Sequence, residues 1–179
     1  MIEQSYLDLL RELSTDESSH SKGRSLLDHL KGTYELLKKW DNPSDVCVGG
    51  LFHSIYGTQY YKVQSADFAD RKHLASVIGS RAEELAFLFC TTDRVGFFTE
   101  ADKPTPVLVD TRTKTSVPVG PETLDALIEI EVANFIEQFE PDTAPAKLIE
   151  FMRYMLKVGN AHMTTKAREE LARVLEQFE

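Results

Sequence analysis

The chain has 179 residues, of which 42% are apolar, so it is long enough and apolar enough to fold as one domain with its own core. The formal net charge of −9 argues against a general nucleic-acid binder, because phosphate contacts need clustered lysine and arginine. A small phosphorylated ligand in a local basic pocket stays compatible with that charge.

The N-terminal residues contain acids and no apolar stretch typical of a secretory signal. No window approaches the run of about 18 apolar residues that a membrane span needs. Cys47 and Cys90 both lie in apolar stretches, which predicts buried free thiols rather than a disulfide framework. We therefore expect a cytoplasmic protein that has no membrane partner.

Apolar spacing predicts an all-α domain of seven or eight helices with one inserted β-hairpin. Strands do not alternate with helices, so a parallel α/β sheet is not expected. Gly49 and Gly50 weaken the third helix, and we expect close packing against a neighbour in return. The predicted helices cover residues 2–13, 24–40, 44–55, 65–79, 80–93, 122–138, 144–158 and 164–178, and the hairpin pairs 107–109 with 116–119.

Two histidines stand out in the second and third predicted helices. His29 shares a helix face with Leu26, Leu30 and Thr33, which points it to the edge of the core. His53 ends an apolar run near the end of the next helix. Because a short turn joins the two helices, they are expected to pack antiparallel and to bring both histidines to the same end. The ordinary alternative is a pair of structural histidines.

The order of these residues resembles the HD-domain superfamily, in which one helix carries a single histidine and the next ends in apolar-apolar-His-Asp. Here the elements are His29 and the stretch Gly50-Leu51-Phe52-His53-Ser54. A later family helix supplies a final aspartate, and the matching stretch here ends at Asn134. The resemblance covers about residues 20–138 and implies one HD-like helical domain over residues 1–179, with C-terminal helices at about 144–178.

Both signature aspartates of the resemblance are missing. Ser54 and Asn134 stand at those positions, and each replaces a carboxylate by a neutral group. Divalent ions depend on such charge, so a dinuclear centre is not expected. If the protein is an enzyme, the resemblance implies that Ser54 and Asn134 are its catalytic residues, and that Asn134 orients water or substrate.

A rebuilt mononuclear centre would draw on Asp93, because some HD branches take a ligand from the helix end where this residue lies. His29, His53 and Asp93 would form a two-histidine, one-carboxylate set for a single Fe, Mn or Zn ion. His20 could add a fourth ligand, and Glu131 is a reserve carboxylate. The same residues could instead hold no metal, with His20 in a plain loop and Asp93 as a helix cap or the partner of a nearby arginine.

Four further residues are candidate ligand contacts. Tyr56 and Thr58 follow His53 on a glycine turn, where hydroxyls could line a pocket or simply pack the loop. Arg81 and Arg94 could bind an anion, because a guanidinium fork suits phosphate, or could form surface salt bridges. The ligand expected from these contacts is a small molecule, with a phosphorylated one among the candidates.

The sequence leaves three functions open. The first is a mononuclear metal-dependent hydrolase of a phosphorylated small molecule or nucleotide. The second is a ligand-binding or regulatory protein on an HD-like scaffold that has lost its metal and its activity. The third, an iron-dependent oxygenase, is the weakest, because it relies on the same missing aspartates. A homo-oligomer is also left open.

Overall fold

A computed structural model of the chain describes residues 1–18 and 23–178, and most of them are helical. The predicted helical domain with one small antiparallel hairpin is therefore confirmed at the level of secondary structure. The α-helices in the described ranges are α1 (Gln4–Glu12), α2 (Leu26–Lys39), α3 (Ser44–Leu51), α4 (Arg71–Ile78), α5 (Ser80–Thr91), α6 (Val95–Thr99), α7 (Pro121–Gln138), α8 (Ala146–Gly159) and α9 (Thr165–Leu175).

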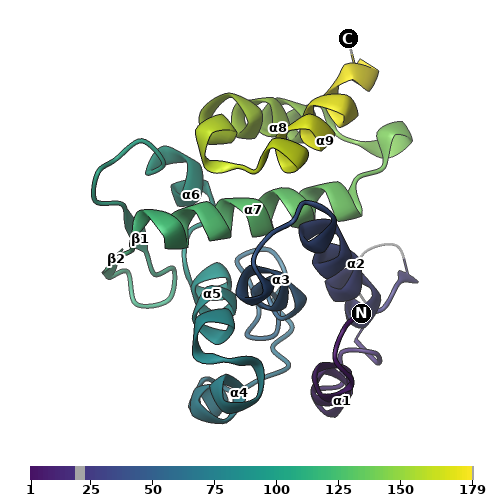
Figure 1. The fold of residues 1–179 in the computed structure, drawn as a ribbon, viewed down its shortest axis with the longest axis vertical. Helices are drawn as coiled ribbons and strands as arrows, with labels where there is room; N and C mark the ends of the chain where they lie inside the picture. Colours follow the sequence, from purple (N-terminus) through teal and green to yellow (C-terminus); the bar gives the residue numbers. More distant parts are fainter. Residues whose placement is uncertain (19–22, 179) are drawn as a thin grey trace.

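Helix α7 is the centre of the arrangement. It crosses the middle of the molecule, with α1–α5 on one side and α8 and α9 on the other (Figure 1). Its residues from Ala126 to Asn134 are all buried, and it contacts α2, α3, α5, α6 and α9. A helix buried on every face is expected to be apolar all round, yet α7 also buries Glu129 and Glu131.

Within the described ranges, no helix combines the length and apolar character needed to cross a bilayer.

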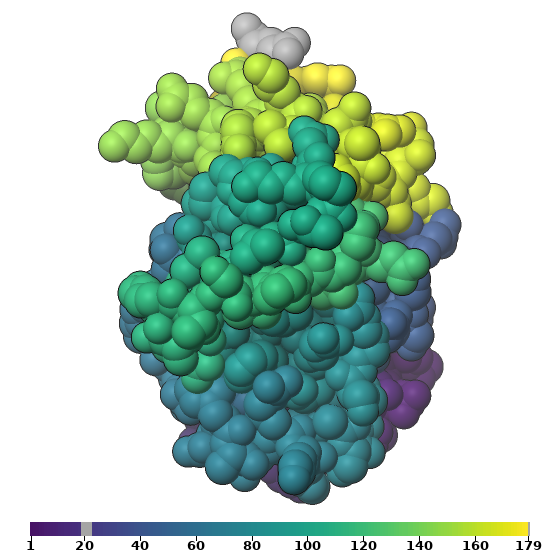
Figure 2. Space-filling view, turned by 90° about the vertical axis from the view of Figure 1, so that its left-hand side faces the viewer, coloured from purple at the N-terminus to yellow at the C-terminus, as the bar shows by residue number. Residues whose placement is uncertain are grey.

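The hairpin consists of β1 (Val107–Val109) and β2 (Ser116–Pro118), paired in antiparallel register with Leu108 opposite Val117. The Asp110 carboxylate accepts the backbone N–H groups of Arg112 and Thr113, which closes the turn. Residues Thr92 and Asp110 form an isolated bridge. Figure 2 views the molecule from the hairpin side, with the C-terminal helices above and α4 and α5 below. The hairpin thus fixes the chain segment that follows α5.

Two predicted helices are longer than the observed ones, and one helix was not predicted. The helix expected over residues 65–79 begins at Phe68 as a 3-10 turn and continues as α4 from Arg71. The helix expected over residues 44–55 ends at Leu51, and the chain then turns through Phe52 to Tyr56, so His53 lies in the turn rather than on the helix. Gly57 completes this turn at φ 73°, a left-handed conformation that favours glycine. The short helix α6 was not predicted, because five residues carry too little periodicity.

Helices α2 and α3 approach each other closely at a glycine, as the sequence predicts. A Cβ atom on Gly50 would lie 2.2 Å from Leu37 Cδ1, and one on Gly49 would lie 3.0 Å from Leu85 Cβ. The distance at Gly50 is not compatible with a side chain in the present packing, and the distance at Gly49 would require Leu85 to move by a few tenths of an ångström. The two glycines therefore let α3 sit between α2 and α5, which places the turn that carries His53.

We predict that Gly50→Ala destabilises the protein by about 1–3 kcal/mol, although alanine has the higher helix propensity, because the new methyl group overpacks Leu37. Urea denaturation at constant m-value measures the change. Gly96→Ala is the matched control, since its Cβ would meet Leu108 Cδ2 at an ordinary 3.6 Å. Equal midpoints for the two variants would contradict the close-packing explanation.

Candidate functional site

The structure brings the two predicted histidines together. His29 comes from α2 and His53 from the turn after α3, and both side chains are fully buried. Their Nε2 atoms lie 3.1 Å apart, and the rings meet edge to face with centroids 5.0 Å apart. The antiparallel packing of two consecutive helices therefore produces the contact that the spacing predicts.

Each imidazole is also held through its other nitrogen. His53 Nδ1 donates to the Gly50 carbonyl at 2.6 Å, and Cys90 Sγ–H donates to the His53 carbonyl at 3.0 Å. His29 Nδ1 bonds to the Glu137 carboxylate on α7. The carbonyl of Gly50 can only accept, which fixes the tautomer of a neutral His53 with the proton on Nδ1.

These contacts determine where the protons lie. Because Nε2 of neutral His53 carries a lone pair, His29 must donate through its own Nε2. His29 Nδ1 faces the Glu137 carboxylate, which accepts, so His29 is placed to donate through both nitrogens. Burial, and next to it the neighbouring His29, hold the pKa of His53 well below its usual value, which favours the neutral form of His53.

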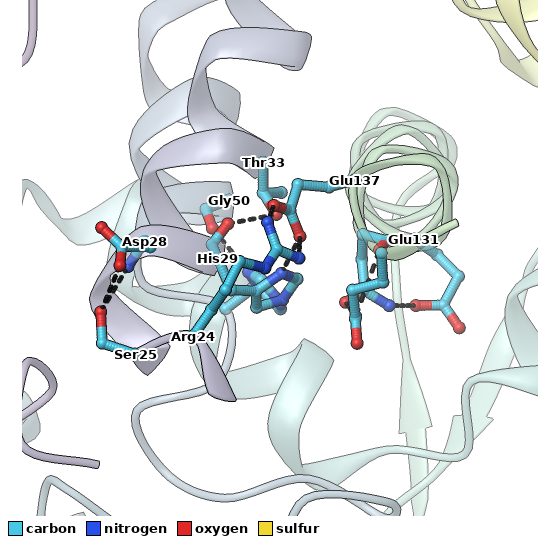
Figure 3. Close-up of polar contacts among 11 residues, drawn as sticks. Arg24, Ser25, Asp28, His29, Thr33, Gly50, Glu131 and Glu137 are labelled. Carbon is cyan, nitrogen blue, oxygen red and sulfur yellow. Dashed lines mark hydrogen bonds and ion pairs between the residues drawn. The ribbon is translucent and has the colours of Figure 1, made fainter. Parts of the chain in front are cut away.

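Glu137 is the residue that sequence reasoning missed. Burial opposes its charge, but hydrogen bonds from His29 and Arg24 hold the pKa of its carboxyl below the usual value. Arg24 reaches it with Nη1 at 2.7 Å and Nη2 at 3.3 Å. In Figure 3, Arg24 and His29 both point at Glu137, while Glu131 lies further along α7. A Cβ atom on Gly32 would lie 2.7 Å from Glu137 Cγ, so this glycine leaves room for the carboxylate.

A cleft with a volume of about 920 Å³ lies beside the histidine pair. It opens between the loop after His53 and helices α7 and α8. Four predicted site residues line it: Ser54, Thr58, Arg94 and Asn134. Its full lining is Ser54, Thr58, Tyr60, Tyr61, Arg94, Val95, Glu131, Asn134, Phe135, Gln138, Phe139, Lys147, Leu148 and Phe151.

The polar wall of the cleft is one hydrogen-bonded chain of side chains. Arg94 Nη1 donates to Glu131 at 3.0 Å, Asn134 Nδ2 donates to Glu131 at 3.2 Å, and Gln138 Nε2 donates to Asn134 Oδ1 at 2.8 Å. Burial raises the pKa of Glu131, and the Arg94 guanidinium opposes that rise. The side chain of Asn134 also acts on His53, where it opposes the fall of the pKa, so this wall lies within reach of the histidine pair.

The remaining predicted site residues lie elsewhere. Tyr56 is buried and donates to Glu83 at 2.7 Å, so it packs the loop instead of lining the cleft. Arg81 pairs with Glu84 on the surface of α5 at 3.0 Å. Asp93 accepts the backbone N–H of Val95, the first residue of α6, at 3.2 Å. His20 lies outside the described residues.

A divalent ion fits the histidine pair in spacing but not in charge. Two nitrogens 3.1 Å apart could share an ion, since zinc–nitrogen distances are about 2.0–2.1 Å. The nearby acids are committed, however: Glu131 pairs with Arg94, and Glu137 bonds the far nitrogen of His29. In the described part of the chain, no group of three or more histidine, cysteine, aspartate or glutamate side chains is arranged to hold a metal.

Comparison with known proteins adds one match. The family described as Domain of unknown function (DUF6817) matches residues 9–94. This stretch includes His29, His53 and Arg94 but stops before α7. No curated protein and no solved structure matches the chain.

We predict that Glu137→Gln destabilises the protein by about 2–4 kcal/mol, because it leaves the buried His29 without its anionic partner. Urea denaturation measures the loss. Glu150→Gln on the exposed side of α8 is the control and should cost less than about 0.5 kcal/mol. A Glu137→Gln variant as stable as this control would refute the stabilising pairing of Glu137 with His29.

The low pKa of His53 predicts a stability that falls in mild acid. Below pH 6.5 the unfolded chain binds a proton at this histidine and the native protein does not, so the stability present above pH 6.5 is lost as pH falls. The free energy of unfolding is measured by urea denaturation at about pH 7.5 and about pH 5.5. We expect His53→Asn to reduce its dependence on pH by up to about 1 kcal/mol per pH unit. Asparagine keeps a donor for the Gly50 carbonyl.

Ser76→Asn, at an exposed position of α4, is the control for this experiment. It should keep the pH dependence of the parent protein, because neither serine nor asparagine ionises in this range. If His53→Asn also has the parental slope, His53 does not contribute the acid sensitivity.

Proposed function

We propose that this chain is a metal-independent ligand-binding protein with an HD-like helical architecture, and that its ligand occupies the cleft beside the histidine pair. The observation that carries the proposal is the charge pattern of the cleft. At the two positions where the HD resemblance expects carboxylates, the cleft is lined by neutral Ser54 and Asn134. Its buried charges are instead an Arg94–Glu131 ion pair.

The state of the histidines supports the same function. A metal ligand or a general base needs a free nitrogen lone pair. His29 donates through both nitrogens, and His53 uses its remaining lone pair to accept from His29. The pair is therefore satisfied within the fold and serves to position α2, α7 and the turn after α3. Ligand recognition is left to the cleft, where open volume and polar groups coincide.

One observation favours a second function, a mononuclear metal-dependent hydrolase of a phosphorylated small molecule. The 3.1 Å separation of the two Nε2 atoms suits two ligands of one ion, and both Nδ1 atoms have the carbonyl or carboxylate partners common behind metal-bound histidines. The Arg94 guanidinium opposes it, because a divalent ion would have to enter beside this charge. The described carboxylates near the pair, Glu131 and Glu137, are already engaged with Arg94 and His29.

Metal analysis together with thermal shift tests the proposal. The purified protein should hold less than about 0.1 equivalent of any transition metal, with no gain after reconstitution with Zn, Mn or Fe. The double variant Ser54→Asp/Asn134→Asp, which restores both carboxylates, should bind one of these ions measurably. The parent protein should gain thermal stability with at least one compound in a library of small organic anions and nucleotides.

The controls separate the two functions. A parent protein with one equivalent of metal, lost in His53→Ala, would overturn the proposal in favour of the hydrolase. A metal-free protein with no thermal shift across the library would refute ligand binding itself.

A further inference from the structure

The cleft has two chemically different walls. One is the polar chain of Arg94, Glu131, Asn134 and Gln138. The second wall is apolar and aromatic: Phe135 and Phe139 on or next to α7 face Leu148 and Phe151 on α8, and the rings of Phe135 and Phe151 lie 5.5 Å apart. An occupant that satisfies both walls has a polar head and an apolar body.

Arg94 has an unused hydrogen-bond donor at the polar wall. Its side chain is only 8% exposed, and its Nε–H has no acceptor in the described ranges. The guanidinium lies against Tyr60 and Phe89, with its Cζ 4.6 Å and 5.1 Å from the ring centroids. These rings hold the guanidinium plane in place. A buried donor without an acceptor is costly, which makes the Arg94 guanidinium, as part of the cleft lining, the favoured contact for an acceptor that a ligand brings.

The charges that line the cleft indicate what charge the polar head of the ligand should carry. They are two cations, Arg94 and Lys147, and one carboxylate, Glu131. The lining thus carries one net positive charge in a chain whose formal net charge is −9. Lys147 is exposed near the start of α8, at the mouth of the cleft. A single negative charge on the ligand balances this lining, whereas a phosphate monoester brings about −1.5 to −2.

We infer that the cleft binds an amphipathic carboxylic acid. Its carboxylate accepts from the Arg94 guanidinium, with the Ser54 hydroxyl as a second donor on the same lining, and its apolar body lies along Phe135, Phe139 and Phe151. This inference rests on the proposed ligand-binding function and adds the class of ligand. It favours a carboxylate over the phosphorylated compound that the sequence left among the candidates.

Matched probes test the head and the body separately by isothermal titration calorimetry. Decanoate should bind. Decan-1-ol lacks the charge, decylammonium reverses it, and butyrate lacks the long chain, so each should bind at least about tenfold more weakly. Decyl phosphate has the same chain with a more highly charged head and should bind more weakly than decanoate.

Variants place the binding in the cleft. The double variant Arg94→Gln/Glu131→Gln removes both buried charges together and leaves neither unpaired, and it should weaken decanoate binding by at least about tenfold. Lys147→Gln should weaken decanoate binding by roughly two- to fivefold, since a charge at the rim of the cleft contributes less than a buried one. Leu148→Gln should also weaken decanoate binding, because it removes an apolar contact of the alkyl group. Lys72→Gln, on the exposed side of α4, is the matched control and should bind as the parent does. Near-ultraviolet circular dichroism checks that each variant is folded. If the double variant unfolds, Lys147→Gln and Leu148→Gln provide the test instead.

Each outcome decides the inference. Equal affinity for decanoate and decan-1-ol would show that the head charge is not recognised. Tighter binding of decyl phosphate would show that the head is a phosphate. No binding of any alkyl probe would also overturn the inference. In all three cases a thermal shift in the wider library would leave ligand binding itself standing.

Discussion

The structure depends on one constraint: α7 is buried among its neighbours and carries three buried acidic side chains, Glu129, Glu131 and Glu137, which need partners. A buried carboxylate is costly unless it is paired and hydrogen-bonded. Glu129 accepts from Asn42 and from the backbone of Thr164, Glu131 from Arg94, and Glu137 from His29 and Arg24. Each partner comes from a different part of the chain. These three acids therefore fix the positions of α2, of the segment between α5 and α6, and of the entry to α9 relative to the central helix.

The elements could be predicted from the sequence, because apolar spacing and turn residues are local signals. The hairpin around Asp110, the long helices and the close packing at Gly50 are examples. The two histidines could be paired because one short turn joins their helices. Glu137 could not be assigned in the same way, since its partners Arg24 and His29 lie more than a hundred residues earlier. The helical spacing from Asn134 to Glu137 was the available signal, and only the fold shows which face of α7 meets α2.

The polar residues around α7 form two groups: a satisfied part, whose members hydrogen-bond one another, and an open part, whose members line the cleft. In the satisfied part, His29, His53, Glu137 and Arg24 use one another and the Gly50 carbonyl as partners, and both histidines are fully buried. In the open part, Arg94 and Ser54 line the cleft, and Arg94 keeps a donor without an acceptor in the described ranges. Asn134 belongs to both, through Glu131 and His53. A network that is complete on one side stabilises a fixed geometry for recognition on the other.

This division gives a physical reason for the neutral residues at positions 54 and 134. Two carboxylates beside Glu131 would add negative charge to a buried region that has one guanidinium to balance it, and without a metal they would repel one another or bind protons. Serine and asparagine avoid that cost and keep hydrogen-bonding capacity on the cleft lining. Arg94 then supplies the positive charge on this wall of the cleft, where its guanidinium pairs with Glu131. A lining with this charge pattern suits a monoanionic ligand, so neutral residues at positions 54 and 134 agree with the proposed binding function.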